Sequence, residues 1–286
     1  MKKLSLFIIA SLLFFSCKPS DTQTTAKNIE PTDFISTDTF GIINFNLESI
    51  EYTKGIKDFL HEKLGKNKEF KILNELKLSF AQFANITVCL NSNELYIITL
   101  KEACEFEQNF NTFLKDKSPK YNGERLLFEN NNVYRLSRKD ESRFCAQVSP
   151  KILVIGQQHE LLSALSIKTT TPAPITKMVD FSLPLSLLIQ QSDLLPPQLK
   201  DIKQLSGKAS YTDSLGLNVE GQFLNLQALK SSENMLRTLL GFTSLPNEMR
   251  KSIKFEQDSM TLKISAQVKD DEVVKLLEEA KREDKK

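Results

Sequence analysis

The chain of 286 residues contains no tryptophan and only two histidines. The lack of tryptophan weighs against a glycan-binding role, because sugars are commonly stacked on exposed aromatic rings, tryptophan above all. His61 and His159 fall in different predicted elements, and neither has a second histidine or a cysteine at the spacing that a zinc site needs. The sequence therefore predicts no metal site.

Glycine and clustered charge are also scarce. The nine glycines are scattered singly, so the chain has neither a glycine-rich phosphate loop nor the Gly-x-Ser-x-Gly elbow of a serine hydrolase. No cofactor and no catalytic residue are predicted. Basic residues number 38 and acids 36, and removal of residues 1–16 would take away Lys2 and Lys3 and leave 36 of each. Without a basic cluster, the composition argues against a nucleic-acid partner.

The N-terminus carries the strongest pattern in the chain. Two lysines are followed by an apolar stretch over residues 4–15, then by Ser16 and Cys17. A basic start, an apolar segment and a small residue before the cleavage point are typical of an export signal. The apolar stretch has about a dozen residues, whereas a membrane-spanning helix needs roughly 20. The pattern therefore predicts an export signal and not a transmembrane helix.

Residues Phe14-Phe15-Ser16-Cys17 resemble the bacterial lipobox, although the family pattern usually has aliphatic residues where the two phenylalanines stand. The resemblance implies cleavage before Cys17 and lipidation of this cysteine, with residues 1–16 as the lipoprotein signal peptide. By similarity to lipoprotein sorting rules, Lys18 implies the outer membrane of a bacterial envelope. The alternatives are an ordinary secretory signal that is cut nearby and an uncleaved anchor. Residues 17–31 are polar and lack apolar periodicity, which predicts a flexible tether.

Three further cysteines follow, and an exported chain meets an oxidising compartment in which one disulfide is permitted. Cys89 lies in the strand pattern ITVCL and is interpreted as a small apolar core residue. Cys104 falls at a strand-to-helix junction, and Cys145 alternates with apolar neighbours. A disulfide between Cys104 and Cys145 is therefore a candidate, although spacing alone does not fix the connectivity.

The body of the chain repeats two patterns in the same order. Residues 42–47 match 178–183, and residues 128–133 match 255–260. These matches predict two modules, residues 32–168 and 175–286, joined by a linker that is rich in threonine and proline. This layout resembles uncharacterised exported lipoproteins of environmental bacteria over residues 34–280. The resemblance implies no activity and no functional residues.

Hydrophobic periodicity and turn residues predict the elements of each module. For the first module they give a strand over 41–47, helices over 56–64 and 69–83, a hairpin over 86–100, a helix over 106–113, hairpins over 124–137 and 144–156, and a helix over 160–165. For the second they give a strand over 177–183, a helix over 184–191, a hairpin over 208–223, a helix over 225–241, a hairpin over 253–268 and a final helix from 270. Hairpins separated by helices predict an α+β fold, in which each module is an antiparallel sheet covered by helices on one face.

Function is less constrained than location. The leading hypothesis is a non-enzymatic envelope protein, held at the membrane by Cys17, that acts as a structural or interaction module with an envelope protein as its partner. The first alternative is a lipid or hydrophobic-ligand binder, in which phenylalanines line an apolar cavity instead of packing as core. The rings concerned are Phe70, Phe80, Phe83, Phe106, Phe110 and Phe113. The second alternative is an enzyme whose acids assemble between the two modules.

Overall fold

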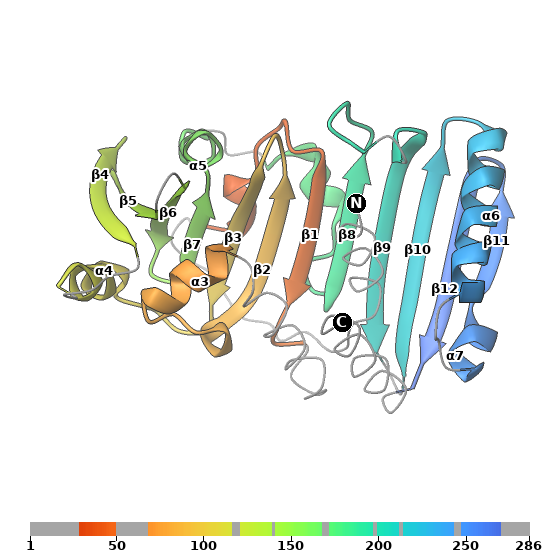
Figure 1. The fold of residues 1–286 in the computed structure, drawn as a ribbon, viewed down its shortest axis with the longest axis horizontal. Coiled ribbons are helices and arrows are strands. Elements are labelled where there is room, and N and C mark those ends of the chain that lie inside the picture. The colour runs from red at the N-terminus through yellow and green to blue at the C-terminus, as the bar shows by residue number, and fades with distance from the viewer. Residues whose placement is uncertain are drawn as a thin grey trace. The chain divides into compact units, whose positions relative to one another are not determined.

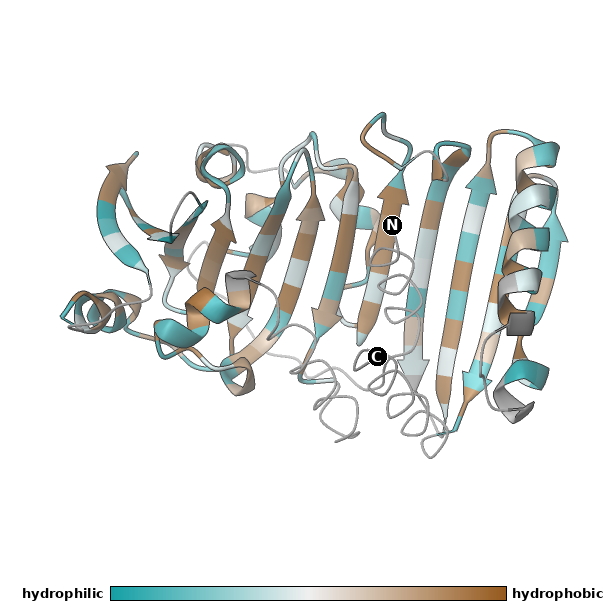
Figure 2. Ribbon diagram, in the orientation of Figure 1, coloured by the Kyte–Doolittle hydropathy of each residue, from teal (hydrophilic) through white to brown (hydrophobic). Residues whose placement is uncertain are grey.

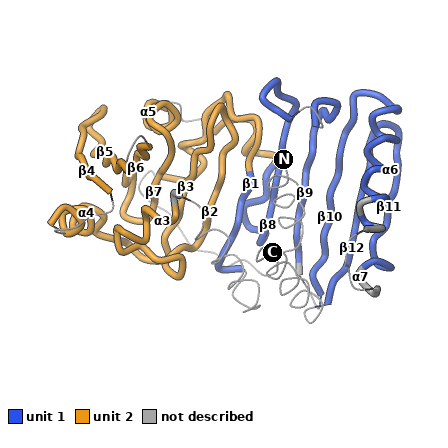
Figure 3. Tube along the Cα trace, viewed as in Figure 1, with its two compact units in different colours: residues 1–19, 43–59, 179–286 blue, residues 20–42, 60–178 orange. Residues whose placement is uncertain are grey.

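A computed structural model describes residues 29–49, 68–115, 121–138, 141–167, 172–196, 199–211, 214–242 and 247–269. Within these ranges the chain forms twelve β-strands and five α-helices (Figure 1). It divides into two compact units, which are coloured separately in Figure 3. Unit 1 comprises residues 1–19, 43–59 and 179–286, and unit 2 comprises residues 20–42 and 60–178. Strand β1 (Gly41–Asn46) crosses the boundary between these ranges.

Unit 2 is built on an antiparallel sheet with the strand order β2-β3-β7-β6-β5-β4. Its strands are β2 (Phe83–Leu90), β3 (Glu94–Leu100), β4 (Asn122–Phe128), β5 (Asn131–Arg138), β6 (Glu141–Ser149) and β7 (Ile152–Gly156). Its helices are α3 (Lys68–Glu75), α4 (Phe106–Leu114) and α5 (Gln158–Leu165), with short 3-10 turns at Pro31–Phe34, Phe80–Gln82 and Pro174–Met178.

Unit 1 contains a second run of antiparallel strands in the order β11-β12-β10-β9-β8. These strands are β8 (Leu185–Gln190), β9 (Ile202–Tyr211), β10 (Leu215–Phe223), β11 (Lys254–Asp258) and β12 (Thr261–Val268). Two helices stand between β10 and β11 in the chain, α6 (Leu226–Phe242) and α7 (Asn247–Ser252). Phe223, Leu229 and Leu262 form a buried cluster between α6 and the sheet.

The core of unit 2 is built from aromatic rings that contact one another. The rings of Phe106 and Phe110 on α4 are fully buried, with centroids 5.0 and 4.7 Å from the ring of Tyr134 on β5. A second group joins Phe70 of α3 to Phe80 and Phe83, with centroids 6.4 and 6.1 Å apart. The six phenylalanines that could either form the core or line an apolar cavity are all buried. Those in contact pack against each other as core side chains do.

Several sequence predictions are confirmed where turn and cap residues mark the ends of elements. The β4–β5 hairpin turns at Glu129 and Asn130, whose φ angles of 43° and 67° are both positive, and asparagine is among the residues that tolerate this region. The hairpins over β2–β3, β6–β7, β9–β10 and β11–β12 also form. Asn225 caps α6 as predicted, because its Oδ1 accepts a hydrogen bond from the N–H of Ala228 at 2.8 Å.

The predicted α+β fold, with two similar modules covered by helices, is wrong. The described residues form mostly antiparallel β-sheet, and four of the five α-helices have nine residues or fewer. The clearest difference lies at 184–191, a predicted helix that is strand β8. Every residue of Leu185–Ile189 is buried, and all except Ser186 are apolar, so both faces of the segment are covered. A short apolar run of this kind has no period that distinguishes a strand from a helix.

Two further elements differ from their predictions. The strand predicted over 177–183 is instead the end of a 3-10 turn followed by tight turns. The helix predicted over 69–83 ends at Glu75, because Lys77 adopts a φ of 63° and the chain then enters β2 at Phe83. A residue in the left-handed region cannot continue a right-handed helix.

Some predictions concern residues outside the described ranges. These are the signal and tether up to residue 28, with Cys17, the helix over 56–64, the linker residues 169–171 and the final helix from 270. In the described part of the chain, no helix combines the length and the apolar character required to cross a bilayer.

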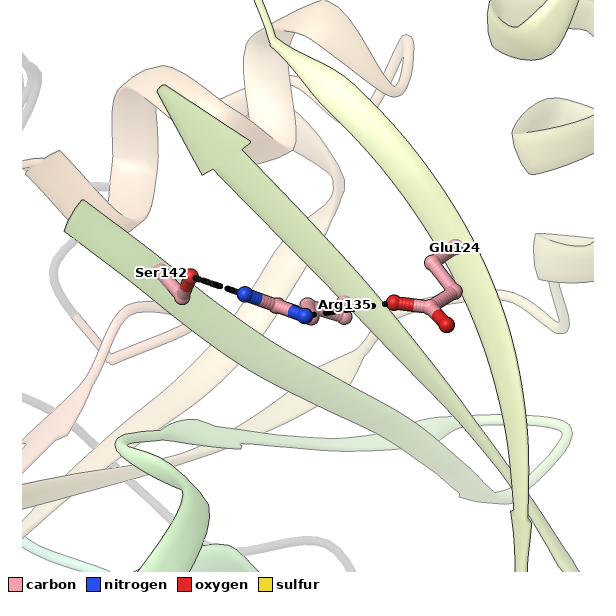
Figure 4. A network of polar contacts seen from close by, with 3 residues as sticks. All are labelled: Glu124, Arg135 and Ser142. Carbon is pink, nitrogen blue, oxygen red and sulfur yellow. Dashed lines mark hydrogen bonds and ion pairs between the residues drawn. The ribbon is translucent and has the colours of Figure 1, made fainter. Parts of the chain in front are cut away.

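A polar network crosses three strands at one end of the unit 2 sheet (Figure 4). Arg135 of β5 lies between Glu124 of β4 and Ser142 of β6, with nitrogen–oxygen distances of 3.3 Å on both sides. The register pairs Arg135 with Glu124 of β4 on one side and with Phe144 of β6 on the other. The guanidinium carbon of Arg135 lies 6.0 Å from the centroid of the Phe144 ring. Because Arg135 and Glu124 are about half exposed, this pair contributes only about 0–1 kcal/mol to stability.

Candidate functional site

Strands β9 to β12 of unit 1 carry polar side chains at alternate positions. Successive side chains of a strand point to opposite faces, and the register decides which residues of neighbouring strands share a face. Asn218 of β10 is paired with Lys208 of β9 and with Ser265 of β12. We call the resulting surface the polar face. It comprises Ser206, Lys208, Ser210, Gly216, Asn218, Glu220, Gln222, Lys254, Glu256, Asp258, Thr261, Lys263, Ser265 and Gln267.

On β10 and β12 the other face is apolar and largely buried. Leu215, Leu217 and Phe223 of β10 lie on it together with Leu262 and Val268 of β12. Figure 2 shows the resulting alternation of hydrophilic and hydrophobic residues along β10. Burial of one face fixes the register, because a shift by one residue would bring the polar set into the core.

A pocket of about 420 Å³ lies at one end of the polar face. This volume is within the range of about 300–1,000 Å³ that small-molecule sites occupy. Its lining consists of Ser210, Ser214, Gly216, Asn218, Ser252, Lys254, Ser265, Ala266 and Gln267. Lys254 is the one charged residue in this lining, and the hydroxyl and amide groups around it can both donate and accept hydrogen bonds. The pocket is therefore suited to a polar group, neutral or negatively charged.

Ser252 fixes one wall of the pocket. Its hydroxyl donates to the backbone carbonyl of Gln267 at 2.7 Å and accepts from the backbone N–H of the same residue at 3.1 Å. These two bonds hold the end of α7 against β12 at the point where β11 begins. The position of Lys254, the first residue of β11, is thereby determined by the sheet and by the end of the helix.

Sequence reasoning missed this surface. The alternation over residues 215–223 (LGLNVEGQF) is visible in the sequence and did identify a hairpin strand. The pocket also needs the pairing of β12 with β10, which brings residues 265–267 beside 216–218. Strands β10 and β12 are separated in the chain by α6, α7 and β11. No local pattern in the sequence therefore specifies their pairing.

The cysteines occupy three different environments. Cys89 is fully buried in β2, as interpreted, and burial raises the pKa of its thiol to about 12. Cys145 on β6 is also buried, which raises the pKa of its thiol, and the adjacent sulfur of Cys104 raises it further. The pKa of Cys104 is raised by partial burial. All three are free thiols in this structure.

Cys104, which precedes α4, is held against β6, the strand that carries Cys145. Gln147 lies two residues after Cys145 and therefore on the same face of β6. Its side-chain amide donates to the backbone carbonyl of Cys104 at 2.8 Å and lies 3.6 Å from its sulfur.

We expect mild oxidation of the purified protein with a disulfide-exchange reagent to consume Cys104 and Cys145 together and to leave Cys89 reduced. Peptide mapping after alkylation under denaturing conditions measures this result, since a cross-linked pair of peptides is 2 Da lighter than the two reduced peptides. The Cys104→Ser and Cys145→Ser variants serve as controls, and neither should yield a cross-linked pair of peptides, because each lacks the thiol that resolves the mixed disulfide. Alkylation of all three cysteines after oxidation would show that the pair does not form a disulfide.

The remaining candidates give no second site. His159 lies in α5, and His61 lies outside the described residues. Across the described ranges, no group of three or more histidine, cysteine, aspartate and glutamate side chains is placed to hold a metal ion. Comparison of the chain with protein-family models, with curated proteins and with solved structures gives no match. The features that point to a function are therefore the N-terminal sequence and the polar face.

Proposed function

We propose that this chain is a non-enzymatic lipoprotein of the bacterial envelope, anchored through Cys17, and that its polar face binds an envelope partner. The observation that carries the second part is the pocket of about 420 Å³ in unit 1. The first part rests on the order of basic, apolar and small residues before Cys17. The polar tether of residues 17–31 would separate the anchor from the folded body.

The composition of the pocket supports binding over simple solvation. A solvated sheet face usually carries long charged side chains, which lose considerable conformational entropy when a partner covers them. Here the lining is dominated by serine and by one glycine, asparagine and glutamine, with Lys254 as its single charge. Such short side chains cost little entropy to immobilise and offer many hydrogen bonds. We infer a partner whose contact surface is polar, with an acidic or neutral group placed against Lys254.

The hydrophobic-ligand alternative receives less support from the described residues. The phenylalanines that could line an apolar cavity contact each other or Tyr134, with ring centroids between 4.7 and 6.4 Å apart. The lining of the pocket contains none of them. Rings in mutual contact fill the space that a lipid chain would need.

A photo-cross-linking residue at position 218 tests the proposed surface in intact cells. Asn218 is exposed at the pocket, and Asn111 on α4 is also an exposed asparagine, in unit 2, that serves as the matched control. We expect a discrete adduct from position 218 and none from position 111. The yield from position 218 should fall when Lys254→Glu reverses the charge in the pocket. Equal adducts from both positions, or an adduct that Lys254→Glu leaves unchanged, would contradict the proposal.

A further inference from the structure

Strand β4 is the terminal strand of the unit 2 sheet, and among the described residues only β5 pairs with it (Figure 1). A terminal strand presents unpaired backbone N–H and C=O groups, to which another strand can hydrogen-bond. Proteins commonly protect such an edge with proline, lysine or a β-bulge. Residues 122–128 contain no proline and no lysine, and all seven pair with β5 without a shift in register. The edge of β4 therefore lacks the usual protection against strand addition.

The hairpin register identifies the backbone groups that point outward from this edge. The β4–β5 loop has two residues, so the pair that flanks it, Phe128 and Asn131, is hydrogen-bonded. Hydrogen-bonded and non-hydrogen-bonded pairs alternate along an antiparallel ladder. The N–H and C=O groups of Gly123, Arg125 and Leu127 consequently point away from β5. In the part of the chain that the structure describes, the backbones of these three residues have no further hydrogen bond.

The side chains of the same three positions lie on the face of β4 that α4 covers. A Cβ atom at Gly123 would stand 2.7 Å from a methyl carbon of Leu114, and Arg125 forms an ion pair of 2.6 Å with Glu107. Leu127 is 74% exposed and Leu114 is 47% exposed. Each end of the outer edge of β4 therefore carries one leucine with much of its surface in solvent.

We propose that β4 pairs antiparallel with β4 of a second copy of this chain, with Arg125 at the two-fold axis. In this register Arg125 is opposite Arg125 of the second copy, and Gly123 is opposite Leu127. All three outward residues of both copies then form hydrogen-bonded pairs, each of which exchanges two hydrogen bonds. The next allowed registers are shifted by two residues. They leave one outward residue of each copy opposite a residue outside β4.

The side chains are complementary in the same register. Leu127 of each copy comes opposite Gly123 of the other, where Leu114 covers the glycine, and directly opposed residues on one face are in contact distance. Both exposed leucines then become covered. The two Arg125 side chains are like charges, but each already has a Glu107 carboxylate at 2.6 Å, so the four charges sum to zero. The inference does not depend on the polar face, which belongs to unit 1.

Cysteine substitution of the purified protein tests this register. The Cα atoms of a hydrogen-bonded pair are about 5.5 Å apart, within the range of about 4.4–6.8 Å that a disulfide needs. In a Cys104→Ser background, Arg125→Cys should give a disulfide-linked dimer on mild oxidation. Leu127→Cys is the matched control, because it would be four residues, or about 13 Å, from its copy along the ladder. Equal cross-linking of both variants, or no more from Arg125→Cys than from the background, would overturn the register.

Sedimentation equilibrium measures the association without oxidation. We expect a reversible monomer–dimer equilibrium, in which Leu127→Lys raises the dissociation constant about ten-fold or more, because it places a charge where each leucine is covered. Met235→Lys replaces a methionine of α6 that is 50% exposed and should associate like the unaltered protein. A protein that stays monomeric at every concentration, or a Leu127→Lys protein with unchanged association, would overturn the proposal. The proposal for the polar face would stand, because an adduct of two copies, from position 111 as from any other, has twice the mass of the chain and differs from an adduct with another protein.

Discussion

Replacement of Cys17 by serine is expected to abolish the incorporation of labelled palmitate and to move the protein out of the membrane fraction. Acyl chains on the sulfur of Cys17 are the proposed attachment, and serine cannot accept them in this linkage. The apolar residues 4–15 cannot substitute for the lipid, since about a dozen residues are too few to span a bilayer stably. A single myristoyl-length chain binds membranes with only about 10⁴ M⁻¹, so stable attachment requires more than one chain.

The control for this experiment is Cys104→Ser, which removes a different cysteine of the same chain. That variant should incorporate palmitate and remain with membranes as the unaltered protein does. Mass spectrometry of the N-terminal peptide adds an independent measurement, because a lipoprotein begins at Cys17 and carries the mass of its acyl chains. Palmitate that persists in Cys17→Ser, or an unmodified N-terminus in the native protein, would rule out the lipid anchor. The polar face would then need a partner that is not confined to the membrane surface.

The sequence predicted hairpins better than it predicted helices, and the reason lies in where the information resides. The β4–β5 turn is specified locally, because Glu129 and Asn130 accept positive φ angles between two strands. The alternation over residues 215–223 similarly identifies a half-buried strand. The segment 185–189 carries no such signal, since four of its five residues are apolar and all five, Ser186 included, are buried. Its conformation is decided by its pairing with β9, which lies beyond any local window.

The candidate sites were also not predictable from local sequence, because their residues are brought together from distant parts of the chain. The pocket combines residues of β9, β10 and β12 that share a face only in the observed register. The cysteines are intermediate, because an oxidising compartment predicts pairing in general and only the fold brings Cys104 beside Cys145.

Replacement of Phe110 by alanine is expected to destabilise the protein by about 3–5 kcal/mol, the range for removal of a fully buried phenylalanine. The ring of Phe110 is 0% exposed and lies 4.7 Å from that of Tyr134 and 6.1 Å from that of Phe113. Close packing continues to β4, where a Cβ atom at Gly123 would come within 3.1 Å of the Phe110 ring. Few neighbours can move into the space, so the cavity should persist.

Two single variants, Phe110→Ala and Leu127→Ala, are compared by thermal and urea unfolding. The comparison distinguishes a packed core of phenylalanines from a cavity that they line. Leu127 lies on β4 and is 74% exposed, so its replacement should change stability by no more than about 0.5 kcal/mol. If the rings form a packed core, Phe110→Ala should lower Tm by roughly 10 °C or more relative to that control. If the rings instead line a space for a lipid chain, Phe110→Ala would only enlarge that space. Its stability would then approach that of Leu127→Ala, and the hydrophobic-ligand alternative would displace the interaction module proposed above.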